Sequence, residues 1–184
     1  TKIFLEEFEK ATKLSEFEQY SELQEGEITE FSNKESKDAL SKGLTACAGI
    51  AFVKSSYPFH YAVHLAENLC GRAKSKAKVI DKKLAPSCLM FYKVQDSFIT
   101  DINEIVERTL TPQSNISFEF GPYHCGEHVK LYKGKCSNTI EKLENQQICL
   151  QGEKGNAIKS SLRQWVSLLF EDVSNADQRV QRFI

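Results

Sequence analysis

A cluster of basic side chains is the first feature of this sequence that could do chemistry. Guanidinium and ammonium groups bind phosphate through charge-assisted hydrogen bonds. Cations at the C-terminal end of a helix also interact favourably with the helix dipole, so a purely structural role is the simpler explanation of the cluster and phosphate binding is the alternative. The cluster consists of Arg72, Lys74, Lys76, Lys78, Lys82 and Lys83.

The segment Cys47-Ala48-Gly49 is a second candidate for phosphate contact. Because Gly49 has no side chain, a ligand could approach its backbone closely. Tight packing of a helix on this segment would require the glycine just as well, and both interpretations stay open.

Two groups of side chains have the ligand types of a zinc site. His60 and His64 have a spacing of four, with Glu67 nearby, but the His-Glu-x-x-His order of a catalytic zinc site is absent. The second group lacks a matching short-spaced second pair, and we interpret its members as ordinary thiols and a surface histidine. Whether they bind a metal stays open; they are Cys125, His128, Cys136 and Cys149.

Carboxylates in a catalytic arrangement are missing. Joining nucleoside triphosphates requires two divalent ions held by carboxylates on a rigid strand or hairpin. Asp96 and Asp101 do not share a helical face, and we interpret them as a helix cap and a solvated surface residue. The sequence therefore predicts neither a catalytic residue nor a catalytic metal site in this chain.

The composition is that of an ordinary soluble domain, with a net charge of −1 and 41% hydrophobic residues. We expect a cytoplasmic protein, because no apolar run approaches the roughly 20 residues of a membrane span and no secretory signal is present. In that compartment the six cysteines are expected to be reduced.

The elements that would position these residues can be predicted from periodicity. Residues 2–20 form an amphipathic pattern with Phe4, Phe8 and Ala11 on the apolar face. Residues 21–42 are polar and acidic, which predicts a long mobile loop. The apolar run 44–53 predicts a central strand covered on both faces.

A helix and a second strand follow. Pro58 can begin a helix that runs to about residue 79, and residues 88–94 form a strand-like run. A short helix is predicted around residues 99–106. A stripe near Trp165 and a last helix capped by Ser174 predict a helical C-terminal end.

The predicted strand, helix and strand of residues 43–94 resemble the second palm domain of the large subunit of type III CRISPR effector complexes. The matching residues are Leu44-Thr45-Ala46-Cys47-Ala48-Gly49-Ile50-Ala51, then Tyr57-Pro58, Ala66-Glu67 and Ala73-Lys74. The tail agrees in outline through Leu110-Thr111 and Gly121-Pro122-Tyr123. GGDEF cyclases share a looser version of this pattern. Cys47 departs from the family, which usually has serine at that position.

The resemblance implies a partial ferredoxin-like palm of α+β class in residues 1–111, followed by a mainly helical domain in residues 112–184. It implies ATP as the ligand of Gly49 and Lys74, with weaker candidates in Cys47, Ala48, Lys76 and Lys78. The complete protein would be a nucleotidyltransferase that uses Mg or Mn to make cyclic oligoadenylate in antiviral defence. Active members carry a Gly-Gly-Asp-Asp hairpin, which this chain lacks, so we expect a fragment that is inactive alone.

The implied partners are the other subunits of a CRISPR ribonucleoprotein complex, with guide and target RNA contacted indirectly and no membrane involved. Two alternatives stay open. The chain could be an inactive palm-like scaffold for assembly of a defence complex, or a GGDEF-type domain that makes a cyclic dinucleotide.

Overall fold

The computed structural model describes residues 1–13, 42–94, 102–113, 116–132 and 134–181. Within them the chain has six α-helices and a three-stranded sheet, so the predicted α+β class is confirmed. The chain forms two compact units. Unit 1 contains residues 1–100 and 121–140, and unit 2 contains residues 101–120 and 141–184. The predicted loop, apart from residue 42, and both Asp96 and Asp101 lie outside the described residues.

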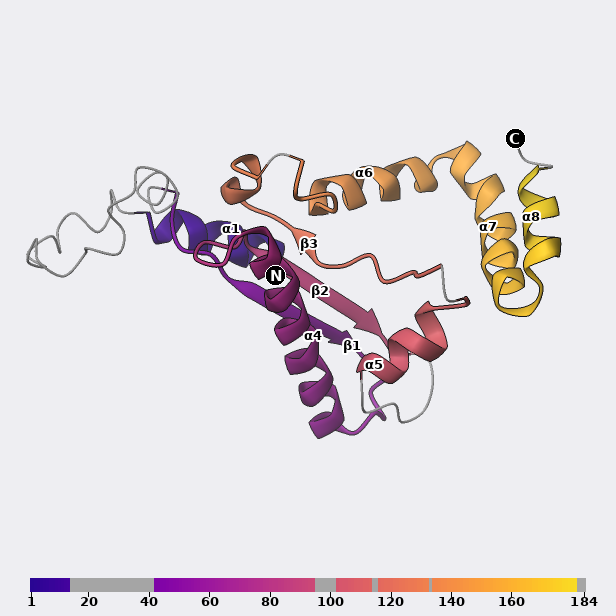
Figure 1. Cartoon of the computed structure of the whole chain (residues 1–184), viewed down its shortest axis with the longest axis horizontal. Helices are drawn as coiled ribbons and strands as arrows, with labels where there is room; N and C mark the ends of the chain where they lie inside the picture. Colours follow the sequence, from indigo (N-terminus) through magenta and orange to yellow (C-terminus); the bar gives the residue numbers. More distant parts are fainter. Residues whose placement is uncertain (14–41, 95–101, 114–115, 133, 182–184) are drawn as a thin grey trace, which may run out of the picture. The chain divides into compact units, whose positions relative to one another are not determined.

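The sheet lies in unit 1 and has the order β1-β2-β3 (Figure 1). Strand β1 (Cys47–Phe52) pairs in parallel with β2 (Cys88–Lys93), and β2 pairs antiparallel with β3 (Tyr123–His124). The prediction that residues 44–53 form a central strand covered on both faces is wrong for the described part of the chain. β2 is the middle strand, and the residues of β1 are half-buried or exposed. An apolar run indicates that a strand is hydrophobic, but it does not determine whether the strand lies in the middle or at the edge of the sheet.

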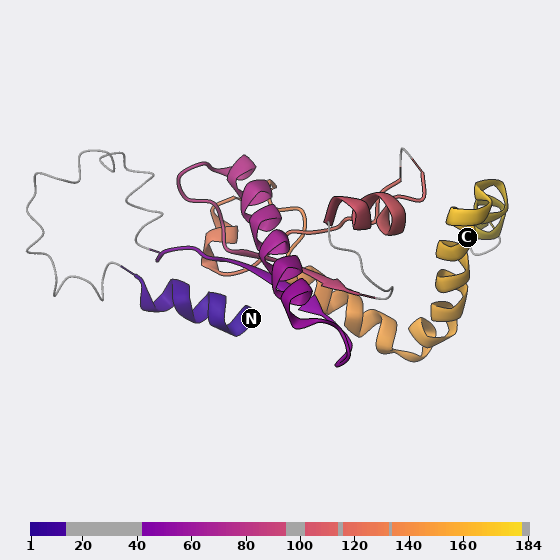
Figure 2. The ribbon, with the colours of Figure 1, turned by 90° about the horizontal axis from the view of Figure 1, so that it is seen from below.

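Helix α4 (Phe59–Ile80) connects the two parallel strands and packs on one face of the sheet (Figure 2). It begins directly after Pro58, as predicted. Its buried residues recur at the spacing of one helical face. At its C-terminal end the Asp81 carboxylate accepts hydrogen bonds from the backbone amides of Lys83 and Leu84, at 2.8 and 2.9 Å. The buried residues of α4 are Leu65, Leu69, Ala73 and Ala77.

Helix α1 (Lys2–Ala11) buries a different face from the predicted one. Leu5 and Glu9 are 1% exposed, whereas Phe4 is 65% exposed. Leu5 belongs to a core cluster with Leu89 and Ile140. The predicted face was chosen from the spacing of the phenylalanines. That spacing could not show that Glu9 is buried against a polar partner that lies far away in the sequence.

That partner is the segment around a short 3-10 helix, Glu127–Lys130. The Glu127 backbone amide donates a hydrogen bond to Glu9 Oε2 at 2.8 Å. The buried His128 Nε2 donates a hydrogen bond to the Gly43 carbonyl oxygen at 2.7 Å, because a carbonyl can only accept. A salt bridge of 3.0 Å between Lys13 and Glu127 lies beside them. These contacts join α1 to residues 126–130.

Unit 2 is helical. It contains α5 (Ile102–Ile105), a π-helix (Val106–Leu110), most of α6 (Ile140–Gln151), α7 (Glu153–Glu171) and α8 (Val173–Gln181). Leu169 and Ala176 are buried where α7 and α8 pack together. Asp172, and not the predicted Ser174, caps α8: its carboxylate accepts hydrogen bonds from the backbone amides of Ser174 and Asn175. Among the described residues, no helix combines the length and the apolarity needed to cross a membrane.

Candidate functional site

Gly49 lies where α4 crosses β1. A Cβ atom built on this glycine would collide with the backbone carbonyl of Ala66 and would lie 2.5 Å from the backbone nitrogen of Cys70. The helix backbone therefore fills the space that a side chain would need. The sequence left two roles open for Gly49, close approach of a ligand and close packing of a helix. The contact with α4 explains the glycine by helix packing.

Cys47 lies opposite Cys88 in the register of the parallel strands. The Cys88 thiol lies 3.6 Å from Cys47 Sγ and donates a hydrogen bond to it. Cys88 Sγ also lies 3.5 Å from the Ala73 carbonyl oxygen, which places this pair on the α4 face of the sheet. Cys88 is completely buried, whereas Cys47 is only partly buried.

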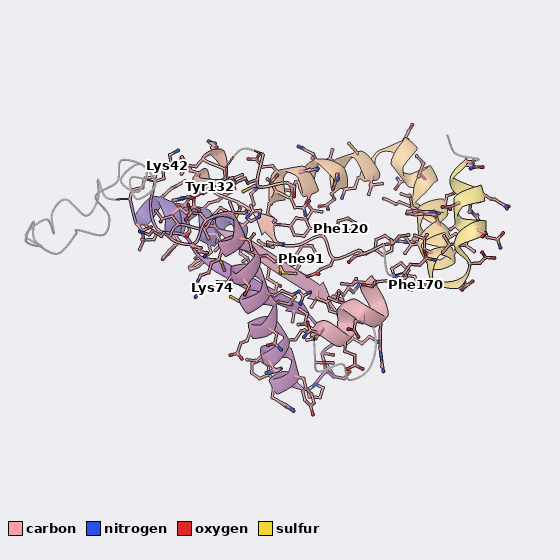
Figure 3. All side chains as sticks on the ribbon, viewed as in Figure 1. Lys42, Lys74, Phe91, Phe120, Tyr132 and Phe170 are labelled. Carbon is pink, nitrogen blue, oxygen red and sulfur yellow. The ribbon has the colours of Figure 1, made fainter. Side chains whose placement is uncertain are left out.

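Two lysines of α4 act electrostatically on Cys47. The hydrogen bond from Cys88, together with the charges of Lys74 and Lys78, lowers the pKa of Cys47 to about 7 against the opposing effect of burial. The hydrogen bond to Cys47 and the burial of the thiol raise the pKa of Cys88. Cys47, Lys74 and Lys78 therefore form one electropositive site beside the start of β1. Both lysines are exposed, and Figure 3 shows Lys74 on α4.

The other sequence-predicted residues are separated from this site. Lys76 Nζ donates a hydrogen bond of 3.3 Å to the Gly121 carbonyl oxygen, so its ammonium group binds another part of unit 1. Ala48 packs against the cluster that contains Leu5 and Leu89, on the sheet face opposite α4. Successive residues of a strand point to opposite faces, which explains why Cys47 lies on the α4 face of the sheet and Ala48 on the other.

The suggested zinc ligands do not come together. His64 Nδ1 lies 3.3 Å from the Asn68 side-chain nitrogen, and His60 lies against the ring of Tyr61. Cys125 Sγ lies 3.9 Å from the Ser87 carbonyl oxygen, and His128 Nε2 is hydrogen-bonded to the Gly43 carbonyl oxygen. In the part of the chain that the structure describes, no three His, Cys, Asp or Glu side chains form a group suited to a metal ion.

Sequence reasoning missed an aromatic surface on the face of the sheet opposite α4. The rings of Phe91 and Tyr123 stack with centroids 5.4 Å apart, and Phe52 meets Phe91 edge to face at 6.3 Å. Phe52 and Phe91 are 52% and 39% exposed. Each of the three rings comes from a different strand, so no pattern within one segment could have found the surface without the strand register.

Comparison with known proteins found no match: no family model fits the chain, and no curated protein or solved structure matches it.

Proposed function

We propose that this chain is the rear part of a palm domain, with its following helices, from the large subunit of a type III CRISPR effector, and that β1, α4 and β2 form one wall of its ATP pocket. The observation that carries the proposal is that the exposed Lys74 and Lys78 follow Ala73 on α4, and the Ala73 carbonyl oxygen lies 3.5 Å from Cys88 Sγ beside the start of β1.

The chemistry suits a triphosphate. Two exposed ammonium groups one helical turn apart supply positive charge on one side of α4. Lys74 and Lys78 would hold the phosphates in place by charge-assisted hydrogen bonds. Divalent Mg or Mn, held by carboxylates outside this chain, would activate the attacking hydroxyl and stabilise the leaving pyrophosphate. This chain contributes binding and orientation, and synthesis of cyclic oligoadenylate belongs to the complete protein.

An ATP titration in the presence of magnesium tests the proposal on the intact protein. Lys74→Ala is expected to weaken ATP binding about tenfold, the value of one charge-assisted hydrogen bond. Lys93→Ala removes an exposed lysine from β2 and should change affinity less than about twofold. Equal affinity in the wild type and Lys74→Ala would contradict the phosphate role of Lys74.

A non-catalytic scaffold is the second candidate, and it is favoured by exposed apolar side chains. Phe52 and Phe91, on the sheet face opposite α4, are 52% and 39% exposed and their rings are in contact. Exposed apolar groups of this kind favour protein contact. A scaffold would bind the neighbouring subunits of the complex with no measurable affinity for ATP in the same titration. Tighter binding of GTP than of ATP would instead favour the GGDEF-type alternative.

A further inference from the structure

The paired thiols of Cys47 and Cys88 form a local chemical site that the proposed nucleotide function does not use. Each lies on one of two neighbouring parallel strands, in register with the other. Neighbouring strands are about 4.8 Å apart, within the Cα separation of about 4.4–6.8 Å that a disulfide requires. The sulfur atoms are already 3.6 Å apart, so side-chain rotation with a small strand adjustment can bring them to bonding distance.

The two thiols differ in a way that gives them different roles. Cys47 is partly exposed and lies in the positive field of Lys74 and Lys78, which favours its thiolate form. Cys88 is completely buried and keeps its proton, donating it toward Cys47 Sγ. Cys47 therefore has the accessibility and charge of an attacking thiolate, and Cys88 has the position of a resolving thiol.

We propose that Cys47 and Cys88 are a redox-active dithiol that a hydroperoxide converts to an intramolecular disulfide. Cys47 thiolate attacks one peroxide oxygen, so the S–O bond forms as the O–O bond breaks. The hydroxide or alkoxide that leaves takes up a proton. Cys88 sulfur then attacks the sulfenic sulfur of Cys47, forming the S–S bond and releasing water that carries the Cys88 proton. Both sulfurs are oxidised by one electron each overall, and one peroxide is reduced.

This inference goes beyond the proposed function and does not rest on it, because neither thiol step involves a nucleotide. It is specific to a chain with cysteine at position 47, and serine there would supply no such chemistry. Lys74 links the two sites, since its charge acts on Cys47.

Peptide mapping by mass spectrometry tests the pairing on the full chain. Hydrogen peroxide is added to the reduced wild-type protein, remaining thiols are alkylated, and disulfide-linked peptides are identified. The expected product links Cys47 to Cys88 at one bridge per chain, while Cys125 stays free. Recovery of both Cys47 and Cys88 as alkylated thiols, or a bridge from Cys47 to Cys70, would overturn the proposal.

Two variants separate the roles of the thiols. Cys88→Ser should trap Cys47 as a sulfenic acid that a dimedone probe labels, and Cys47→Ser should leave Cys88 unlabelled. In the wild type, alkylation of Cys47 should be half-maximal near pH 7, and Lys74→Ala should shift this midpoint upward. Because the wild-type mapping needs no variant, the test holds even if either serine substitution prevents folding. Labelling at Cys88 rather than Cys47 would contradict the assignment.

Discussion

The α-carbon of Gly49 on β1 lies against the backbone carbonyl of Ala66 on α4, closer than any side chain at position 49 would allow. A strand and a helix approach this closely only where one of them presents no Cβ. This contact fixes α4 on the sheet and thereby fixes Lys74 and Lys78 beside Cys47. The position of the cationic site is therefore set by a residue that carries no charge.

Gly49→Ala is expected to destabilise the protein by about 2–4 kcal/mol, because the added methyl group must push the helix backbone off the strand. Gly71, also on α4, has no atom within 4 Å of a built Cβ. Gly71→Ala should therefore stabilise the protein by about 0.5–1 kcal/mol through helix propensity. Urea unfolding measures both, and a Gly49→Ala protein as stable as the wild type would show that α4 does not contact β1 in this way.

Gly126 is the second glycine whose replacement we expect to be costly. Its φ is +84°, and a Cβ there would collide with the Glu9 carboxylate. Gly134 has a similar φ of +88° with nothing within 4 Å of a Cβ at that position, so it serves as the control without a steric clash. Gly134→Ala should cost about 1 kcal/mol, and Gly126→Ala should cost about 2 kcal/mol more because it also displaces a buried carboxylate. Equal losses in urea unfolding would show that Glu9 does not occupy this position.

His124 on β3 should make the stability of the protein depend on pH. It is 5% exposed, and burial lowers its pKa below the ordinary value of 6.5. As pH falls below about 6.5, the unfolded chain takes up a proton that folded His124 does not. Stability is therefore lost between that value and the folded pKa, with a slope approaching about 1.4 kcal/mol per pH unit.

His124→Gln should reduce this loss, measured as the difference between the unfolding free energies at about pH 7.5 and about pH 5.5. The matched control is His60→Gln, which removes an exposed histidine from α4 and should keep the wild-type difference. If His124→Gln also keeps it, another group is responsible for the acid sensitivity.

Local signals predicted the local elements well. Pro58 marks the start of α4, and apolar runs mark both parallel strands, because helix starts and strand runs depend on neighbouring residues. The predicted buried face of α1 was wrong because Glu9 Oε2 accepts a hydrogen bond from the backbone amide of Glu127, a partner 118 residues away. The two-residue strand β3 gave no period to detect.

The candidate site was predictable only in part. Lys74 and Cys47 could be selected individually, but their proximity depends on how α4 packs. The pairing of Cys47 with Cys88 depends on strand register, which two separate apolar runs do not specify. Lys76 has the same residue type as Lys74 and Lys78, and its partial burial and its hydrogen bond to Gly121 distinguish it.

The contact between Glu9 and residues 126–127 has a consequence for how the protein is made. Translation delivers the chain from its N-terminus, so α1 leaves the ribosome before the Glu127 amide that donates a hydrogen bond to the Glu9 carboxylate. Residues 101–120, which belong to unit 2, are synthesised between these two parts of unit 1. The nascent chain therefore carries an incomplete unit 1 core until residue 140 has emerged.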